Sequence, residues 1–508
     1  MTHTAPPAAP PAVNLEARTQ YLSIVVLGLG IFMAALDLTI VAPAFPALQQ
    51  SFNVSARAIA WVIGMYALFN VLSQPTMAKL ADRHGRRAVY LADIACFGVG
   101  SLLAFLSPNF GIFLLARAIQ GIGAGGIFPT ANAIIGDIFP KERRGLAYGV
   151  TGSLWGMAAI IGPNLGGVLT QHASWHWLFI INLPLAVIVF VLGMRVLPDL
   201  RPALRGPLDI RGLIYLTLSL VGLMGALNEV RGDDFWHSLV SQSVLFSFAA
   251  FLWFGYLFVF TERRAESPII PIALYRHRDL RIADGLGVIA GIVESSLVFM
   301  PTLAVIVLGF STEKSGYFLT PAAITLGFAT PAVGIMLDRF GPRPVLVTGT
   351  LITALGLFML GMLVNSTGTF LLALIVGGIG LSSLLGTPLR YLTANAVGPD
   401  ERATGMAVLS ISTNVGIAVG SALTGAIISS QHASHPVASI HRAYIVLGFI
   451  TLLAVPIAAQ IHRRTAEQTA AVLALVAARK ERRAARQAAR QAAKAAPSTT
   501  GDDYRVLD

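Results

Sequence analysis

The sequence predicts an all-α integral membrane protein, because it is strongly apolar, contains many long apolar runs and distributes its positive charges unevenly between them. Of its 508 residues, 55% are hydrophobic and only 12% are charged, and the mean hydropathy is +0.71. This is more apolar surface than one soluble core buries. The single cysteine, Cys96, excludes an intrachain disulfide and a multi-cysteine metal or redox site.

Fourteen apolar runs are long enough to cross about 30 Å of hydrocarbon, which takes roughly 20 helical residues. These runs fall near residues 21–43, 58–78, 88–106, 110–130, 146–169, 177–197, 210–229, 238–260, 282–309, 315–336, 344–364, 369–389, 404–429 and 443–461. The Pro- and Ala-rich residues 1–20 precede a first run that has no small-residue cleavage site. We therefore expect a disordered cytoplasmic tail followed by a retained helix.

The formal net charge of +11 follows from membrane topology. If the first run crosses outward from the cytoplasm, 31 of the 36 Lys and Arg residues lie on the inner side and four lie on the outer side. This asymmetry is the positive-inside pattern. We therefore expect a multi-pass protein of the cell (inner, cytoplasmic) membrane with both termini in the cytoplasm. The basic charge predicts a lipid bilayer as partner, and no nucleic acid.

Residues 463–508 are predicted to be a basic cytoplasmic tail. Five of its basic residues recur every three or four positions, on one face of an Ala-rich helical pattern: Arg479, Arg483, Arg486, Arg490 and Lys494. Two interpretations stay open. The helix rests on anionic lipid head groups, or it is a solvated extension with no role.

Repeated blocks indicate an internal duplication. AKLADRHGRR at 78–87 matches GIMLDRFGPR at 334–343, GIGAGG at 121 matches GIGLSS at 378, PKERRG at 140 matches PDERATG at 399, and QHAS occurs at 171 and 431. The predicted organisation is a six-helix half at 21–197, two inserted helices with their connectors at 198–270, and a second six-helix half at 271–462. GIGAGG fits a dinucleotide-binding pattern, but it lies inside an apolar run rather than after a strand, which argues against that function.

Five motifs, in the expected order, carry a family resemblance. They are ALDLTIVAPAFP at 35–46, LADRHGRR at 80–87, LLARAIQGIGAGG at 114–126, AIIGPNLGG at 159–167 and WHWLFIINLP at 175–184. Together they resemble the motifs of major facilitator superfamily transporters, specifically the fourteen-helix drug:proton antiporter branch. The departures are Ala78, Ala42 and His176, where the family usually has Gly, Asn and Arg.

The resemblance implies the major facilitator fold, with two six-helix bundles plus two inserted helices, and multidrug efflux that gives antibiotic resistance. It also implies that an antiporter motif in the fifth run sets the direction of transport. The residues of this motif are Gly162, Pro163, Gly166 and Gly167. Pro163 removes one backbone hydrogen bond and allows a bend, and simple helix packing is the alternative role.

The two charged blocks are predicted to form a conformational gate on the cytoplasmic side. An Asp at a helix junction pairs with Arg or lies at the positive N-terminus of a neighbouring helix, and such a contact holds the halves closed. The predicted gate residues are Asp82, Arg83, Gly85, Arg86, Arg87, Asp338, Arg339, Gly341 and Arg343. The alternative is a purely positive-inside anchor.

Among the charged residues inside apolar runs, where one charge costs about 2.5–3.5 kcal/mol on insertion scales, three are candidates for a functional role. The three candidates are Asp37, Arg117 and Glu294. We expect Asp37 and Glu294 to face a central cavity, to exchange protons and to attract a cationic substrate, while Arg117 modulates the affinity of Asp37 for its proton. The alternative is a structural Asp37–Arg117 pair and a Glu294 bonded to a neighbouring helix. Trp155 is the candidate aromatic residue of the pocket.

These features predict a non-enzymatic, proton-coupled antiporter that exports hydrophobic, cationic drugs by alternating access. We expect a small-molecule substrate, a monomer, no metal or other cofactor besides the coupling proton, and room for a periplasmic adaptor. Export of an endogenous metabolite or lipid is an alternative, and a non-transporting membrane receptor or scaffold is the alternative from another class. No nucleophile arrangement and no phosphate loop with its Lys occurs, which argues against an ATPase.

Overall fold

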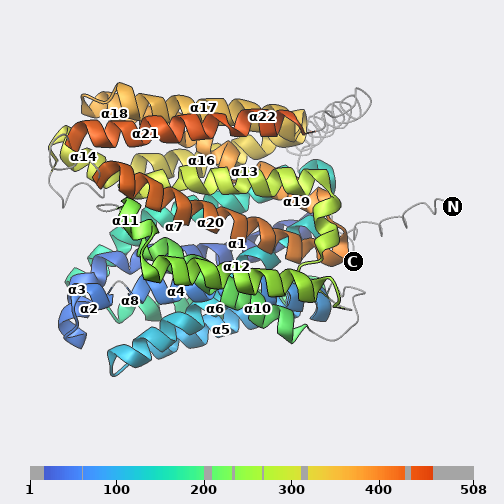
Figure 1. Ribbon diagram of the computed structural model, residues 1–508. Coiled ribbons are helices and arrows are strands. Elements are labelled where there is room, and N and C mark those ends of the chain that lie inside the picture. The colour runs from blue at the N-terminus through green and yellow to red at the C-terminus, as the bar shows by residue number, and fades with distance from the viewer. Residues whose placement is uncertain are drawn as a thin grey trace, which may run out of the picture. The chain divides into compact units, whose positions relative to one another are not determined.

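A computed structural model describes residues 17–59, 61–199, 209–230, 235–265, 268–310, 319–429 and 436–461 (Figure 1). These residues form helices and short connections, with no strand among them. The first helix begins at Ala17. Residues 17–20, which were predicted to belong to the tail of residues 1–20, are therefore part of this helix. Residues 1–16, the second QHAS block and the basic tail at 463–508 lie outside the described residues.

The N-terminal half contains six membrane-spanning segments joined by short helices. The spanning segments are α1 (Ala17–Ile40), α4 (Trp61–His84), α5 (Arg86–Phe105), α6 (Phe110–Ile138), α7 (Arg144–His172) and the pair α8 (Trp177–Ile180) and α9 (Asn182–Val196). The short elements are η1 (Ala42–Ala44), α2 (Phe45–Phe52), α3 (Ala56–Ile59) and η2 (Lys141–Arg143).

Two further spanning helices follow, α10 (Ile210–Glu229) and α12 (Gln242–Glu262), with α11 (Phe235–Leu239) between them. They pack against each other, and α10 also contacts α4 and α20 (Arg402–Ser429). Val71 of α4 packs with Leu216 and Leu220 of α10 in one small apolar cluster. The inserted pair therefore covers the line along which α4 and α20 meet.

The C-terminal half repeats the six-segment pattern with more interruptions. Its elements are η3 (Ile272–Arg276), α13 (Arg278–Glu294), η4 (Ser295–Phe299), α14 (Met300–Leu308), α16 (Leu319–Phe340), α17 (Pro342–Met362), α18 (Thr367–Leu385), α19 (Thr387–Ala396), η6 (Pro399–Glu401), α20, α21 (Pro436–Leu452) and α22 (Ala454–Ala459). One spanning segment consists of α13, η4 and α14, and another consists of α18 and α19.

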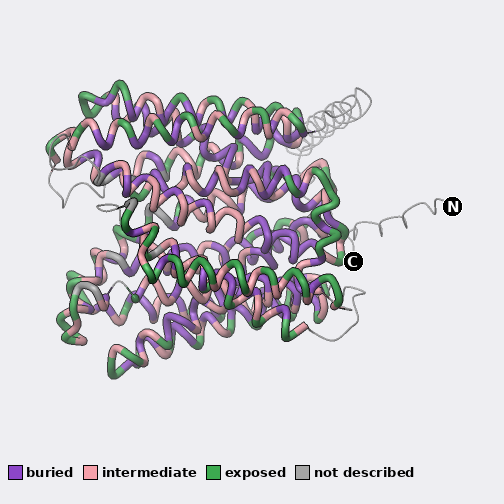
Figure 2. Tube along the Cα trace, in the orientation of Figure 1, coloured by how far each residue is buried: buried purple, intermediate pink, exposed green. Residues whose placement is uncertain are grey.

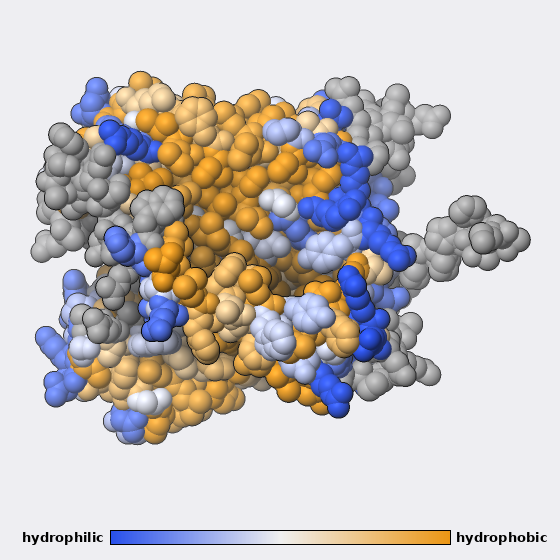
Figure 3. All heavy atoms as spheres, in the orientation of Figure 1, coloured by the Kyte–Doolittle hydropathy of each residue, from blue (hydrophilic) through white to orange (hydrophobic). Residues whose placement is uncertain are grey.

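Within the described ranges, thirteen helices are long and apolar enough to cross a membrane. The fourteenth expected span corresponds to α4, which has 24 residues but carries Asn70, Ser73 and Gln74 in its middle. These polar residues lower its mean hydropathy. Figure 3 shows a hydrophobic band across one face, with hydrophilic residues gathered toward both ends of the helices. The chain is therefore a multi-pass membrane protein.

Each half has a large apolar core, and the N-terminal one also includes Leu337, Tyr391, Ala394 and Met406 of the second half. The N-terminal core includes Leu27, Tyr90 and Phe97, and the C-terminal core includes Phe370 and Tyr444, all fully buried. Buried positions alternate with exposed ones along the outer helices (Figure 2), as expected for amphipathic packing against a core and lipid. The halves meet through α7 against α16 and α4 against α20.

A single glycine connects the two helices at each charged block. Gly85, between α4 and α5, has φ 102°, and Gly341, between α16 and α17, has φ 84°. This left-handed region is readily accessible only to glycine. The apolar runs at 58–78 and 88–106 predicted a charged connection of several residues between them. This prediction is wrong, because Arg86 and Arg87 already belong to α5. We call the end of the bundle that carries Gly85 and Gly341 the elbow end.

Candidate functional site

A cavity of about 460 Å³ lies between the two halves. Helices α1, α4, α6 and α7 of the first half line it, together with α13, η4, α16, α18, α19 and α20 of the second half. Its wall is mainly apolar and aromatic, with Tyr66, Phe128 and Trp155 among the lining side chains. This volume and this lining are typical of sites for small organic molecules.

The polar side chains of the cavity divide between the halves. Four amides line it, Asn70, Gln74 and Asn132 from the first half and Asn414 from the second. Both charged lining residues, Glu294 and Arg390, come from the second half. The first half therefore presents aromatic rings and amides to the cavity, and the second half adds the charges.

Glu294 is the last residue of α13, where the α-helix changes into the 3₁₀ segment Ser295–Phe299. Its side chain is half-buried and lines the cavity. The expected cavity position of this carboxylate agrees with the structure. The alternative, a hydrogen bond from a neighbouring helix, does not occur among the described residues.

Arg390 lies in α19 and is the charged cavity residue that sequence analysis missed. The predicted span ended at residue 389, so Arg390 was assigned to the following connection. Its guanidinium carbon lies 4.4 Å from the centroid of the Phe128 ring, a cation–π distance. The signal that identifies it is an apolar helical stretch that continues beyond it, through Thr367–Ala396.

Asp37 and Arg117 form a fully buried pair inside the first half. Arg117 Nη1 donates to Asp37 Oδ2 at 2.5 Å, and both side chains have 0% exposure. Asp37 Oδ1 accepts from Gln120 Nε2 at 3.1 Å and from Asn182 Nδ2 at 2.9 Å. Three donors from α6 and α9 thus satisfy the carboxylate of α1, as a buried charge requires.

Arg117 is held on its other side as well. Its Nε donates to the Val62 carbonyl of α4 at 3.1 Å, and its guanidinium carbon lies 4.5 Å from the centroid of the Tyr66 ring. Tyr66 lines the cavity, whereas Asp37 and Arg117 do not. The expectation that Asp37 faces the cavity is therefore wrong, because α6 and α9 supply its partners from within the first half.

At the elbow end, Asp82 of α4 receives the N-terminus of α20. Its carboxylate accepts from the backbone N–H of Ala403 at 3.3 Å and of Thr404 at 2.9 Å, and from the Thr404 hydroxyl at 2.9 Å. Arg86 Nη2 donates to the same carboxylate at 3.0 Å. Backbone N–H groups at a helix N-terminus favour a negative charge, so Asp82 joins the two halves.

Asp338 makes the equivalent contact in the second half. Its carboxylate, at the end of α16, accepts from the backbone N–H of Gly145 at 2.9 Å and of Leu146 at 3.0 Å, at the start of α7. The duplicated aspartates thus cap helices of opposite halves. Two contacts of the same kind are the symmetric result of the duplication that the repeated blocks predicted.

Four further residues extend this network across the halves. Arg86 and Arg402 both pair with Asp137 at the end of α6, and Arg144 donates to the side chain of Asn395. The sequence did not predict Asp137, Arg144, Asn395 or Arg402 as gate residues, although Arg144 and Arg402 are each the first residue of a helix, α7 or α20, that begins within a repeated block. All the inter-half hydrogen bonds and ion pairs named here lie at the elbow end.

The other predicted gate residues have different surroundings. Arg87 donates to the Met194 carbonyl within its own half, and Gly85 and Gly341 form the elbows. Arg83, Arg339 and Arg343 make no hydrogen bond or ion pair with the described residues. Asp82, Arg86 and Asp338 are thus the predicted gate residues that join the halves.

The predicted antiporter motif brings α7 and α1 together. A Cβ on Gly162 would lie 2.0 Å from Thr39 Oγ1, and one on Gly166 would lie 2.2 Å from the Ile40 carbonyl oxygen, whereas one on Gly167 would meet nothing within 4 Å. Pro163 lies inside α7, which remains helical through it. Trp155 belongs to the same helix, before the motif, and lines the cavity as expected.

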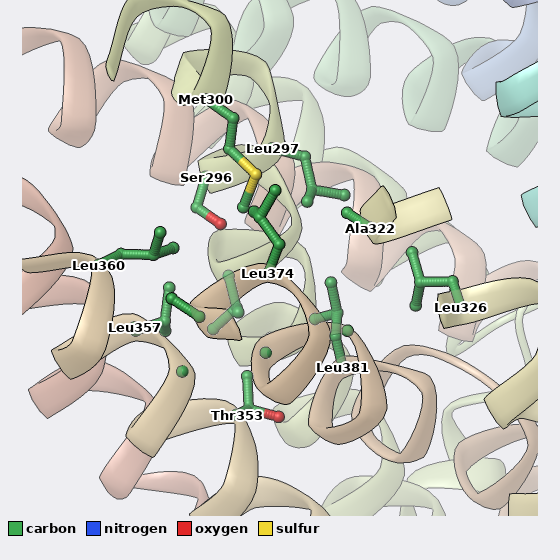
Figure 4. A pocket seen from close by; sticks show the side chains of 15 residues that line it. Ser296, Leu297, Met300, Ala322, Leu326, Thr353, Leu357, Leu360, Leu374 and Leu381 are labelled. Carbon is green, nitrogen blue, oxygen red and sulfur yellow. The ribbon is translucent and has the colours of Figure 1, made fainter. Parts of the chain in front are cut away.

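A second cavity lies within the C-terminal half and has a volume of about 20 Å³. Met300, Leu357, Leu360, Leu374 and Leu381 surround it, and Ser296 and Thr353 supply the only side-chain oxygens among the labelled residues (Figure 4). This volume holds about one water molecule. The cavity between the halves is therefore the candidate site. The described residues contain no cluster of His, Cys, Asp and Glu that would hold a metal ion.

Comparisons with known proteins agree with this architecture. The family model of the Major Facilitator Superfamily matches residues 27–275 and 285–496. The chain is 33% identical to the uncharacterized MFS-type transporter YfiU of Bacillus subtilis, over 82% of this chain and 81% of that protein. It is also 33% identical to multidrug resistance protein 3 of Bacillus subtilis, over 68% of this chain and 67% of that protein.

A solved structure shares the fold. The human organic anion transporter MFSD10 superposes with a TM-score of 0.64 at 17% identity, over 86% of this chain and 99% of that chain. At this identity the likeness concerns the fold alone. The family match, the relatives and the paired six-segment halves together identify the chain as a transporter that belongs to the Major Facilitator Superfamily.

Proposed function

We propose that the chain is a proton-coupled antiporter of the fourteen-helix drug:proton branch, which exports hydrophobic, cationic compounds from the cytoplasm by alternating access. The observation that carries the proposal is Glu294, a carboxylate without a hydrogen-bond partner among the described residues, in a largely apolar cavity between the halves. A single carboxylate binds either a proton or a cationic substrate, but not both at once. Binding of one therefore requires release of the other, and this competition couples proton movement to substrate movement in the opposite direction.

The inter-half contacts support a rocking movement. Asp82 and Asp338 join the halves at the elbow end, and these contacts have to break when the cavity opens there. We propose that the elbow end faces the cytoplasm, because the Lys and Arg residues concentrate on that side. Both termini are then cytoplasmic, and the membrane is the cell membrane.

Asp37 has a different role in this proposal. Its carboxylate links α1 to α6 and α9 through charge-assisted hydrogen bonds, which are stronger than neutral ones. Protonation of Asp37 would weaken all of these contacts and loosen the packing of α1. We propose that Asp37 and Arg117 couple proton binding to helix position, whereas Glu294 meets the substrate. The coupling ion is the proton, the working unit is a monomer without a cofactor, and a periplasmic adaptor fits an export route.

Names of relatives support the choice of substrate class. Several relatives at about 30% identity are named as multidrug resistance proteins, and another is named a tetracenomycin C resistance and export protein from Streptomyces glaucescens. Export of varied hydrophobic compounds fits the aromatic and apolar lining of the cavity.

Reconstituted vesicles that contain a pH-sensitive dye test the proposal. A hydrophobic fluorescent cation should evoke proton movement opposite to its own, and Glu294→Gln should reduce this flux at least about tenfold, the scale expected from losing one charge-assisted contact. Glu229→Gln, an exposed carboxylate at the end of α10, is the matched control. Proton flux in the same direction as the cation would contradict antiport, and no flux with any compound would favour a receptor or scaffold.

A further inference from the structure

The two charges in the cavity are not paired with each other. Glu294 lies at the end of α13 and Arg390 lies in α19, and both line the cavity. They interact electrostatically, but among the described residues no carboxylate lies within ion-pair distance of Arg390. The cavity therefore presents one carboxylate and one guanidinium as separate groups.

Arg390 is incompletely satisfied by the protein. Its Nη1 is buried and has no hydrogen-bond partner among the described residues, and its guanidinium rests on the Phe128 ring, which belongs to the opposite half. Gly152 of α7 leaves space beside it, since a Cβ there would come within 3.6 Å of Nη1. An unpaired polar group at membrane depth is costly, so its presence points to a ligand.

The surroundings of Arg117 differ from those of Arg390. Arg117 also lies at membrane depth, but Asp37, Gln120 and the Val62 carbonyl accept hydrogen bonds from it, and only its Nη2 lacks a partner among the described residues. Arg117 thus has an anionic partner and two further acceptors, whereas Arg390, which lines the cavity, has no anionic partner and no acceptor for its buried Nη1 among the described residues. Guanidinium groups bind planar carboxylates through two parallel hydrogen bonds, and this is the group that Arg390 lacks.

A ligand with one charge satisfies only half of this site. A cation is attracted by Glu294 and repelled by Arg390, whereas an anion is attracted by Arg390 and repelled by Glu294. We propose that the cavity selects dipolar aromatic compounds, with a cationic group for Glu294, a carboxylate for Arg390 and an apolar body that packs on Phe128 and Trp155. The inference rests on the proposed function in one respect, since it takes this cavity as the transport site.

A matched pair of dyes tests the proposal. A rhodamine with a free carboxylate is a zwitterion at neutral pH, and its ethyl ester has the same ring system with only the positive charge. Equilibrium binding to the full chain in lipid nanodiscs, without a pH gradient, should be at least about tenfold tighter for the zwitterion, the scale of one hydrogen bond to a charged group. Empty nanodiscs correct for partition of the more hydrophobic ester into lipid.

Arg390→Gln should remove the preference for the zwitterion and leave binding of the ester unchanged or stronger. Arg390→Lys should keep part of the preference, because it retains the charge without the planar pair of donors. Arg276→Gln, at an exposed arginine of η3, is the matched control and should keep the whole preference. Unfolding temperatures of all variants identify any loss of fold.

Two results would overturn the proposal. One is that the unchanged protein binds the ester as tightly as the zwitterion or more tightly. The other is that Arg390→Gln and Arg390→Lys lose affinity for both dyes to the same extent. The binding measurement needs no proton gradient, so it separates this inference from the antiport proposal. Tight zwitterion binding without proton-driven export would contradict the proposed function alone, and export of cations without a zwitterion preference would contradict this inference alone.

Discussion

At the scale of single residues, the hydrogen-bond partners of a charge indicate its role. Asp37 has three donors and no contact with the cavity, while Glu294 has a cavity position and no donor among the described residues. A fully satisfied buried carboxylate stabilises one helix arrangement, and an unsatisfied one is available to a proton or a ligand. Arg117 and Arg390 differ in a related way, because Arg117 has an anionic partner in Asp37 and Arg390 has none among the described residues.

Asp37→Asn should therefore lower the stability of the protein. The change leaves Arg117 buried without its anionic partner, and breaking a buried pair in this way typically costs about 3–5 kcal/mol. Asp37→Asn combined with Arg117→Gln should recover part of the loss, because the unpaired charge is removed. Unfolding temperatures in detergent measure both effects.

Glu294→Gln is the comparison for this experiment. Because Glu294 has no hydrogen-bond partner among the described residues, its neutralisation should leave the unfolding temperature unchanged or raise it. A drop in Glu294→Gln as large as that in Asp37→Asn would contradict the assignment of one carboxylate to structure and the other to the cavity.

At the scale of elements, glycines determine how closely helices approach. Gly85 and Gly341 allow α5 and α17 to begin with a single residue between them and the preceding helix, and this short connection places Asp82 and Asp338 within three residues of a helix junction. Gly162 and Gly166 let α7 lie directly against Thr39 and Ile40 of α1. Each of these glycines has a specific neighbour, which sets it apart from Gly167.

Gly162→Ala and Gly167→Ala form a matched pair within one motif. The new methyl group at Gly162 would overlap with Thr39, and overpacking of this kind costs about 1–3 kcal/mol. The methyl group at Gly167 meets nothing within 4 Å, and alanine is favoured over glycine inside a helix by roughly 0.5–1 kcal/mol. We expect a lower unfolding temperature and weaker transport for Gly162→Ala, and an unchanged or higher unfolding temperature for Gly167→Ala. Similar behaviour of the two variants would argue against close α1–α7 packing.

At the scale of the whole molecule, the position of the inter-half contacts determines which end is closed. Asp82, Asp137, Asp338 and their partners all lie at the elbow end. These contacts involve charges and helix N-termini rather than apolar area, so they can break and form again as the halves move. Asn395 occupies the position in the second half that corresponds to Asp137 in the first half. Arg402 therefore pairs with a carboxylate, whereas Arg144 donates to a neutral amide.

Asp82→Ala should shift the protein toward opening at the elbow end. It removes the acceptor for two N–H groups of α20 and one partner of Arg86, and loss of a helix cap costs about 1–2 kcal/mol. A shift of that size changes the ratio of two conformations by roughly five- to thirtyfold. The labelling rate of Ser410→Cys in a Cys96→Ala background, with a membrane-impermeant maleimide, reports access to the cavity.

Labelling from the elbow side should become faster in Asp82→Ala, and labelling from the opposite side should become slower. Asp338→Ala should act in the same direction, because it removes the matching cap on α7. An unchanged labelling rate from the elbow side in both variants would contradict a gating role for these contacts.

Part of the site was predictable because its signals are local. Apolar runs, a charge inside a run and repeated blocks all lie within short stretches of sequence, and they located Glu294, Asp82, Asp338 and Trp155. Arg390 was missed because hydropathy defines span ends only to within several residues. The one-residue elbow was missed because the charges of Arg86 and Arg87 resemble a loop, although both begin a helix.

The sequence by itself determined that this chain is a multi-pass membrane protein with duplicated halves, because lipid requires long apolar helices and duplication leaves matching blocks. Only the tertiary structure decided that Asp37 pairs with Arg117, that Asp82 caps α20 and that Glu294 and Arg390 share one cavity. These contacts join residues that are far apart in the chain. Their geometry depends on how whole helices pack, and neither hydropathy nor periodicity records that packing.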